Sequence, residues 1–275
     1  MGPSTILRDM LTEIARGVHV RQSAFSQSNA VVIRGSSGAL LVDPGISGDE
    51  LDDLGDDLDS MGIVVTMGFS THPHWDHLLW HERFGDVARY GTAKCVATAR
   101  ERLAGNREKA SRLAPGAPLD MLDAVTALPP GAAELPWRGR TIRILEHDAH
   151  APGHAALFVE DVRVLIAGDM LSDVEIPLFD ARGSDPCGDY VVALDLLASV
   201  PADVVIPGHG SVGFGTDVGS RIEADRAYVR ALLAGIDAAD SRVGSDATYG
   251  LDWLPEAHQD NVELASQRST ARPES

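Results

Sequence analysis

Three apolar runs, each as long as a buried strand, end in a side chain that can bind a metal ion. The side chains at their ends are Asp43, Asp169 and His209. In α/β proteins the ligand crevice lies beyond the carboxyl ends of the strands. We therefore expect these three residues, far apart in the sequence, to meet at one site of an α/β fold. The runs are ALLVDPG at 39–45, VRVLIAGD at 162–169 and ADVVIPGHG at 202–210.

The rest of the chain alternates between strand and helix patterns. In residues 48–61, leucines recur at helical spacing with acidic residues between them, which indicates an amphipathic surface helix. We expect one main domain over residues 1–240 and a C-terminal extension over 241–275, with the last ten or so residues disordered. Further strands are predicted at 17–22, 30–34, 63–69, 140–146 and 155–160, and further helices at 97–113, 190–199 and 219–239.

The net charge indicates which partners the protein can bind, and the cysteine content indicates its cellular compartment. The chain has 41 acidic and 23 basic residues and a net charge of −18, which repels phosphate backbones and anionic lipids. We expect a small-molecule substrate and neither nucleic acid nor a membrane as partner. Cys95 and Cys187 fit no metal or disulfide spacing, and the first residues do not resemble a secretory signal. These features predict a cytoplasmic protein, and no pattern indicates its oligomeric state.

The sequence H-x-H-x-D-H follows directly after an apolar strand. In an extended segment, residues two apart point to the same side, so His72 and His74 can reach one metal. Pro73 keeps that segment from becoming helical. Asp76 and His77 begin a predicted helix (HLLWHERF), where adjacent side chains diverge, and are placed to reach a neighbouring metal. A solvated histidine-rich loop is the alternative, and its position after a strand disfavours it.

The H-x-H-x-D-H segment resembles the signature of the metallo-β-lactamase superfamily. Four other segments resemble further motifs of that family in the expected order, and the resemblance spans roughly residues 17–215. It implies a four-layer αββα sandwich and a metal-dependent hydrolase. The four segments are SNAVVIRGSSGALLVDPG, APGH at 151–154, LIAGD at 165–169 and IPGHG at 206–210.

The resemblance also implies a ligand set. Asp169 would bridge two metals, and Asp43 would orient a ligand histidine by a hydrogen bond. Asp43 as a turn former and Asp169 as a strand-end cap are the alternatives. His150 is the alternative to His154, because the break at Pro152 and Gly153 leaves the two histidines free to face differently, and His147 fits the pocket rim or the surface. The first metal would be held by His72, His74 and His154, and the second by Asp76, His77 and His209.

Five imidazoles and two carboxylates suit two Zn²⁺ ions per chain, and they suit iron or manganese as well, because no thiolate biases the choice. The predicted reaction is attack by a hydroxide held between the metals. Asp76 is the candidate catalytic residue, because its carboxylate can accept a hydrogen bond from that hydroxide and aim it.

The substrate is the least constrained part of the prediction. A complete H-x-H-x-D-H is typical of the thioesterase, lactonase and phosphodiesterase branches, and we expect a small ester, lactone or thioester. Two alternatives remain: a mononuclear iron oxygenase similar to the persulfide dioxygenases, and a non-catalytic, metal-stabilised binding module. Candidate pocket residues, for which core packing is the alternative, are Trp75, Ile176, Phe179 and Tyr190.

Overall fold

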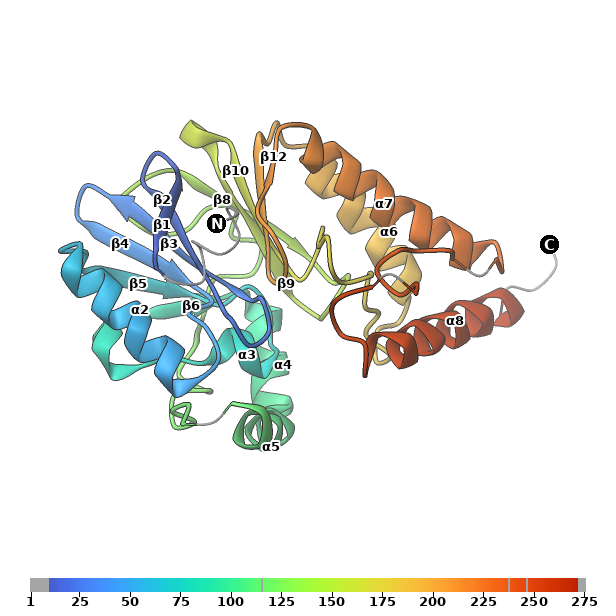
Figure 1. The fold of residues 1–275 in the computed structure, drawn as a ribbon, viewed down its shortest axis with the longest axis horizontal. Coiled ribbons are helices and arrows are strands. Elements are labelled where there is room, and N and C mark those ends of the chain that lie inside the picture. Colours follow the sequence, from blue (N-terminus) through green and yellow to red (C-terminus); the bar gives the residue numbers. More distant parts are fainter. Residues whose placement is uncertain (1–9, 115, 237, 246, 272–275) are drawn as a thin grey trace.

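Two β-sheets stack face to face, with helices on both outer faces (Figure 1). The structure is a computed structural model, and it describes residues 10–114, 116–236, 238–245 and 247–271. This arrangement is the predicted four-layer αββα sandwich, so the fold prediction is confirmed.

The first sheet changes from antiparallel to parallel pairing halfway across. Its first four strands pair antiparallel, and the pairs from β4 to β7 are parallel. Parallel pairing puts the carboxyl ends of β4 and β5 at one edge, so the residues that follow these strands lie side by side. In spatial order the strands are β1 (Thr12–Ala15), β2 (Val18–Gln22), β3 (Asn29–Gly35), β4 (Gly38–Val42), β5 (Val65–Phe69), β6 (Arg89–Gly91) and β7 (Thr126–Ala127).

The second sheet brings three further chain segments to the same edge: the turn between β8 and β9, which carries His150, and the segments after β10 and β11. β10 pairs parallel with β11, so Asp169 and His209 follow neighbouring strand ends. An isolated bridge between Ser28 and His209 links this edge to the first sheet. In spatial order the strands are β12 (Gly213–Phe214), β11 (Val204–Pro207), β10 (Val164–Gly168), β9 (His154–Val159) and β8 (Ile142–His147).

Apolar side chains fill the space between the sheets and beneath the helices. Ile33, Leu157 and Ile206 belong to the central cluster, and all are fully buried. A second cluster lies beneath α2 and a third beneath the C-terminal helices. On the side of the first sheet are α2 (Gly48–Ser60), α3 (Trp75–Leu78), η1 (Glu82–Phe84), α4 (Ala93–Glu101) and α5 (Leu103–Leu113); η2 (Glu160–Val162) joins β9 to β10, and α6 (Pro186–Ala198), α7 (Thr216–Leu233) and α8 (Leu254–Ala271) cover the second sheet.

Several predicted elements differ from those observed. The predicted helix at 97–113 is two helices that meet at Arg102. Of the helix predicted over HLLWHERF, only His77 and Leu78 lie in α3, and Glu82–Phe84 form the short η1, because the backbone turns extended at Leu79 and buries the apolar side chains there. α8 includes residues 266–271 of the tail predicted to be disordered, and residues 272–275 lie outside the described chain. No helix in the described ranges is long and apolar enough to cross a membrane.

Candidate metal centre

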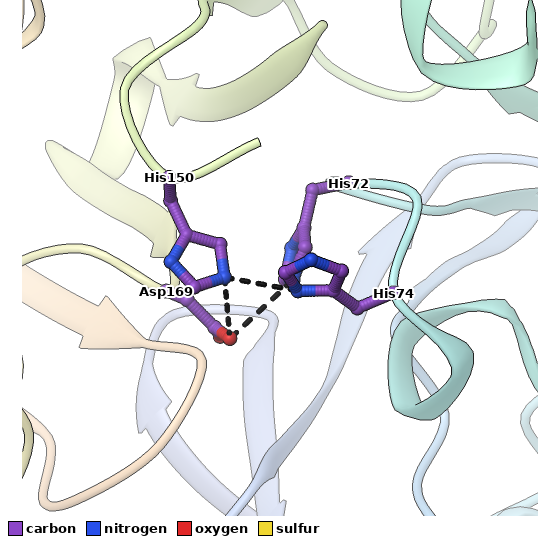
Figure 2. Close-up of side chains that lie close together, drawn as sticks. All are labelled: His72, His74, His150 and Asp169. Atoms are coloured by element: carbon purple, nitrogen blue, oxygen red, sulfur yellow. Dashed lines mark hydrogen bonds and ion pairs between the residues drawn. The ribbon is translucent and has the colours of Figure 1, made fainter. Parts of the chain in front are cut away.

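Seven side chains meet at the shared edge of the two sheets and form two groups. Within each group the ligand atoms lie within 4.8 Å of one another. Asp169 lies between the groups, with Oδ2 3.4 Å from His72 Nε2 and Oδ1 3.2 Å from His77 Nε2. The first group is His72, His74, His150 and Asp169, which converge in Figure 2, and the second is Asp76, His77 and His209.

The local backbone sorts the H-x-H-x-D-H residues between the groups. The chain bends through residues 71–74 after β5, His74 itself has an extended backbone with a ψ of 150°, and the helix begins at Trp75. His72 and His74 therefore point into the first group. Asp76 and His77 lie on α3 and point into the second group.

Asp43 fixes the orientation of two candidate ligands with one carboxylate. Its Oδ2 lies 2.9 Å from His77 Nδ1 and accepts a 2.6 Å hydrogen bond from the Thr71 hydroxyl. Because that hydroxyl donates to Asp43, it accepts from His72 Nδ1, 3.0 Å away. Both histidines thus carry a proton on Nδ1, which leaves Nε2 of each ring facing the centre as the nitrogen that a metal can use. Asp43 has a positive φ of 46°, a backbone conformation that Asn and Asp tolerate better than most residues.

His150 takes the place that the sequence analysis gave to His154. His150 Nε2 lies 3.0 Å from His74 Nδ1 and 3.4 Å from Asp169 Oδ2. His154 Nε2 instead lies 3.1 Å from the Ala167 carbonyl, so it carries a proton and has no lone pair for a metal. The ring of His154 packs behind His72, at 4.8 Å between centroids. His154, the ligand predicted from the sequence, therefore lies outside both groups, and the alternative, His150, is the residue in the cluster.

The turn between β8 and β9 explains this exchange. Gly153 has a φ of +74°, and its N–H donates to the Asp148 carboxylate at 2.8 Å. The turn starts β9 at His154, which faces into the protein, and holds His150 at the tip above the centre. His147 is buried against His154 and lies outside both groups.

The remaining two ligands depend on close backbone packing. A Cβ on Gly208 would lie 1.8 Å from Asp169 Oδ1, so only glycine leaves room for this carboxylate. His209 Nδ1 lies 2.9 Å from the Ser26 carbonyl and donates to it. The other ring nitrogen, Nε2, faces Asp76 Oδ2, 3.3 Å away, and is the nitrogen left for a metal once it has released its proton.

The donor atoms fit a pair of divalent cations. Among the described residues, His72 Nε2, His77 Nε2 and Asp169 Oδ1 are buried and form no hydrogen bond, which is costly unless something else satisfies them. His74 Nδ1 and His150 Nε2 are 3.0 Å apart. Two nitrogens bound to one tetrahedral zinc at about 2.0–2.1 Å would be about 3.3 Å apart.

Charges in the cluster differ between the two groups. Burial lowers the pKa of His150 to about 3 and the pKa of His74 well below its usual value. Burial also lowers the pKa of His209, but Glu175, Asp169 and Asp76 together raise it to about 10. The pKa of His77 is likewise raised, against burial, chiefly by Asp169 and Asp43. The first group is thus ready to bind a cation, whereas the second must release protons to do so.

A cavity of about 910 Å³ opens above the cluster. Of the predicted pocket residues, Trp75 lines it. Ile176, Phe179 and Tyr190 do not line it. They pack in the core cluster around α6, which is the alternative that the sequence analysis gave, and the Tyr190 hydroxyl donates to the Leu178 carbonyl at 3.0 Å. The loop before α6 turns most of its apolar side chains inwards and leaves Leu178 to line the cavity.

Three cavity residues were missed by the sequence analysis. Tyr249 donates from its hydroxyl to the Ser26 carbonyl at 2.9 Å, and this hydroxyl lies 3.5 Å from His209 Nδ1. The Glu175 carboxylate lies 4.0 Å from the same nitrogen, and burial raises its pKa to about 7. Trp253 lines the outer wall. None of the three belongs to a motif, so only the fold reveals them.

Arg242, the single arginine of residues 240–265, is part of the scaffold. Its guanidinium is buried and donates to the carbonyls of Ser172 and Glu175 and to the Asp225 carboxylate, at 2.6–3.0 Å. It therefore holds the loop that carries Glu175.

Comparison with known proteins identifies the family. The model of the metallo-beta-lactamase superfamily matches residues 24–209. A beta-lactamase domain protein from Burkholderia ambifaria is 20% identical over 96% of this chain and 89% of its own, with a TM-score of 0.70. The metallo-beta-lactamase family protein TTHA1429 from Thermus thermophilus is 24% identical over 80% and 81%, with a TM-score of 0.60.

A third solved structure, TTHA1623 in a di-iron-bound form, is 22% identical over 70% of this chain and 91% of its own, with a TM-score of 0.54. These three likenesses show the fold, and the family match covers the segment from Ala24 to His209 that supplies every residue of the two ligand groups. The chain belongs to the metallo-beta-lactamase superfamily.

Proposed function

We propose that the protein is a dinuclear metallo-hydrolase, with zinc as its metal, that cleaves a small ester, lactone or thioester. The observation that supports this most directly is the pair of ligand groups that meet at Asp169. When bound, two such cations supply a hydroxide at neutral pH, by lowering the pKa of water to about 7, and polarise a carbonyl oxygen.

The chain's own side chains would position the reaction. Asp76 lines the cavity, and its Oδ2 is held 3.3 Å from His209 Nε2. From there its carboxylate can accept a hydrogen bond from the nucleophile and orient it. Asp43 keeps the ligand rings fixed from behind, so little reorganisation accompanies the reaction.

The walls of the cavity support an apolar acyl or alcohol group. Trp75, Leu178 and Trp253 line the same space as the ligand cluster. Such walls exclude water from the substrate and strengthen the electrostatic interactions inside.

Metal analysis and a substrate panel test the proposal together. We expect about two metal ions per chain and hydrolysis of esters, lactones or thioesters, and we expect the variant His74→Ala to lose both. His81→Gln is the matched control, because His81 pairs with Asp52 at the surface and lies outside both ligand groups. Full turnover by metal-free His74→Ala, or activity on phosphodiesters alone, would refute the proposal.

The same assays separate the alternatives. One iron per chain together with oxygen consumption would select a mononuclear oxygenase. The second group argues against this alternative, because a single iron would leave Asp76, His77 and His209 without a metal to bind. A metal-loaded protein that is inert across the panel would select a binding module.

A further inference from the structure

One face of α5 lines the cavity above the ligand cluster and carries two basic side chains. Asn106, Lys109, Arg112 and Leu113 all line the cavity, and their spacing of three and four residues puts them on one side of the helix. The Asn106 side chain donates to the Pro73 carbonyl at 2.9 Å. Since Pro73 lies between the ligands His72 and His74, this bond fixes α5 relative to the metal centre.

Lys109 and Arg112 differ from most basic residues of this acidic chain. Neither forms an ion pair with any described residue, although Arg107, on another face of α5, lies 3.9 Å from an Asp123 carboxylate oxygen. The two cations lie about 4.5 Å and about 9 Å further along the helix axis than Asn106, at 1.5 Å per residue. Two charges without an ion-pair partner among the described residues thus lie on the same wall of the cavity, about one and two helical turns beyond Asn106.

The rest of the cavity lining suits a hydrocarbon chain that runs from the ligand cluster to the two cations on α5. Leu113 and Trp253 give apolar surface between the cluster and the outside. Asp252 also lines the cavity and forms no ion pair with a described residue, so it disfavours an anion near itself. An anion in the cavity would therefore lie on the α5 side.

We propose that the substrate is an amphiphilic ester or thioester whose end remote from the scissile bond is a carboxylate, bound by Lys109 and Arg112. This inference rests on the proposed function and names its substrate class. The net charge of −18 keeps anions away from most of the surface. A local pair of cations is then what lets an anionic substrate enter this cavity in preference to a neutral one.

Matched esters test the proposal. One set is the mono-p-nitrophenyl esters of linear dicarboxylic acids from succinate to sebacate, and the other is the p-nitrophenyl esters of monocarboxylic acids of equal length. We expect a higher kcat/KM for the dicarboxylate ester at the chain length that spans from the cluster to α5. We expect the double variant Lys109→Gln/Arg112→Gln to lower the ratio of the two kcat/KM values about five- to tenfold, as two exposed ion pairs allow.

Two further variants make the test specific. Arg100→Gln removes another exposed cation that forms no ion pair with a described residue, on α4 and outside the cavity lining, and should leave the ratio unchanged. Asp252→Asn should raise the ratio about two- to threefold, as removal of one exposed like charge allows. The preference should also weaken in about 1 M salt, where the screening length falls to about 3 Å.

A binding experiment separates failure of this inference from failure of the proposed function. Suberate and octanoate are titrated into the protein, with tryptophan fluorescence as the signal because Trp75 and Trp253 line the cavity. If the wild type binds suberate more tightly than octanoate, and the double variant loses this preference, the inference is supported even if no ester is cleaved. Equal ratios for wild type and double variant, in both binding and hydrolysis, would overturn it.

Discussion

Asp43 holds two candidate ligands, one directly and one through Thr71, and its replacement gives the first prediction. In Asp43→Asn, an amide NH₂ in place of Oδ2 would face the Nδ1–H of His77 and the Thr71 hydroxyl, and in place of Oδ1 it would face the Thr71 N–H. Either orientation sets one donor against another and disturbs the ligand rings, while asparagine tolerates the positive φ. We expect metal affinity to fall about 10- to 100-fold, measured by competition with a chelator of known affinity. An unchanged affinity would show that Asp43 does not orient the ligands.

We predict opposite effects on metal content for substitutions of His150 and His154. His150→Gln should remove at least one metal ion per chain, because its ring lies between His74 and Asp169. His154→Gln should retain the metal, since a glutamine NH₂ can still donate to the Ala167 carbonyl. Elemental analysis of both purified variants decides the matter. Loss of metal in His154→Gln alone would restore the assignment made from the sequence.

His147 gives a pH prediction that does not depend on metal. Burial lowers its pKa to about 4 in the folded protein, against about 6.5 when unfolded. Between these pH values the unfolded chain binds the proton first, so stability falls as the pH falls from about 6.5 to about 4. The contribution is at most about 3 kcal/mol. With chelator present, the free energy of unfolding by urea should fall less for His147→Leu than for wild type between about pH 6.5 and about pH 4. Parallel pH profiles for the two proteins would show that His147 does not cause the loss.

At the residue scale, the sequence was informative where a motif has a fixed local geometry. The extended segment of His72 and His74 predicts their common direction, and the helix start predicts the divergence of Asp76 and His77. The choice between His150 and His154 depended on how the turn at Gly153 starts β9. That turn is held by a hydrogen bond to Asp148 that no sequence pattern reveals.

At the scale of elements, the buried ion pair of Arg242 ties α7 to the loop over the site. Arg242→Met would leave Asp225 buried without its partner, and we expect a loss of about 3–5 kcal/mol in the free energy of unfolding by urea. Arg226→Met, on α7 itself, is the control, because its pairs with Asp195 and Glu223 are at the surface and should cost at most about 1 kcal/mol. Equal effects of the two substitutions would show that burial does not decide the outcome.

The elements that sequence patterns missed are those whose buried face is short or polar. β7 and β12 have two residues each, too few to show a period. α8 buries Leu254 and Ala265, but His258 and Asn261 share that face. Asn261 donates to the Pro177 carbonyl at 2.6 Å. A helix that packs through polar contacts lacks the apolar periodicity from which helices are predicted.

At the scale of the molecule, the candidate centre joins the two sheets. The H-x-H-x-D-H residues follow β5 of the first sheet, whereas His150, Asp169 and His209 come from loops of the second. Motif order along the chain was therefore enough to predict the sandwich and nearly all of the cluster. The cavity walls were not predictable in the same way, because Tyr249 and Trp253 come from the segment before α8, beyond the last motif.

Anomalous X-ray diffraction at the zinc edge, on crystals of the purified protein, tests the central claim most directly. We predict two peaks: one within bonding distance of His72, His74 and His150, the other within bonding distance of Asp76, His77 and His209, with the Asp169 carboxylate between them. A single peak, a peak bonded to His154, or no bound metal at any transition-metal edge would contradict the dinuclear centre.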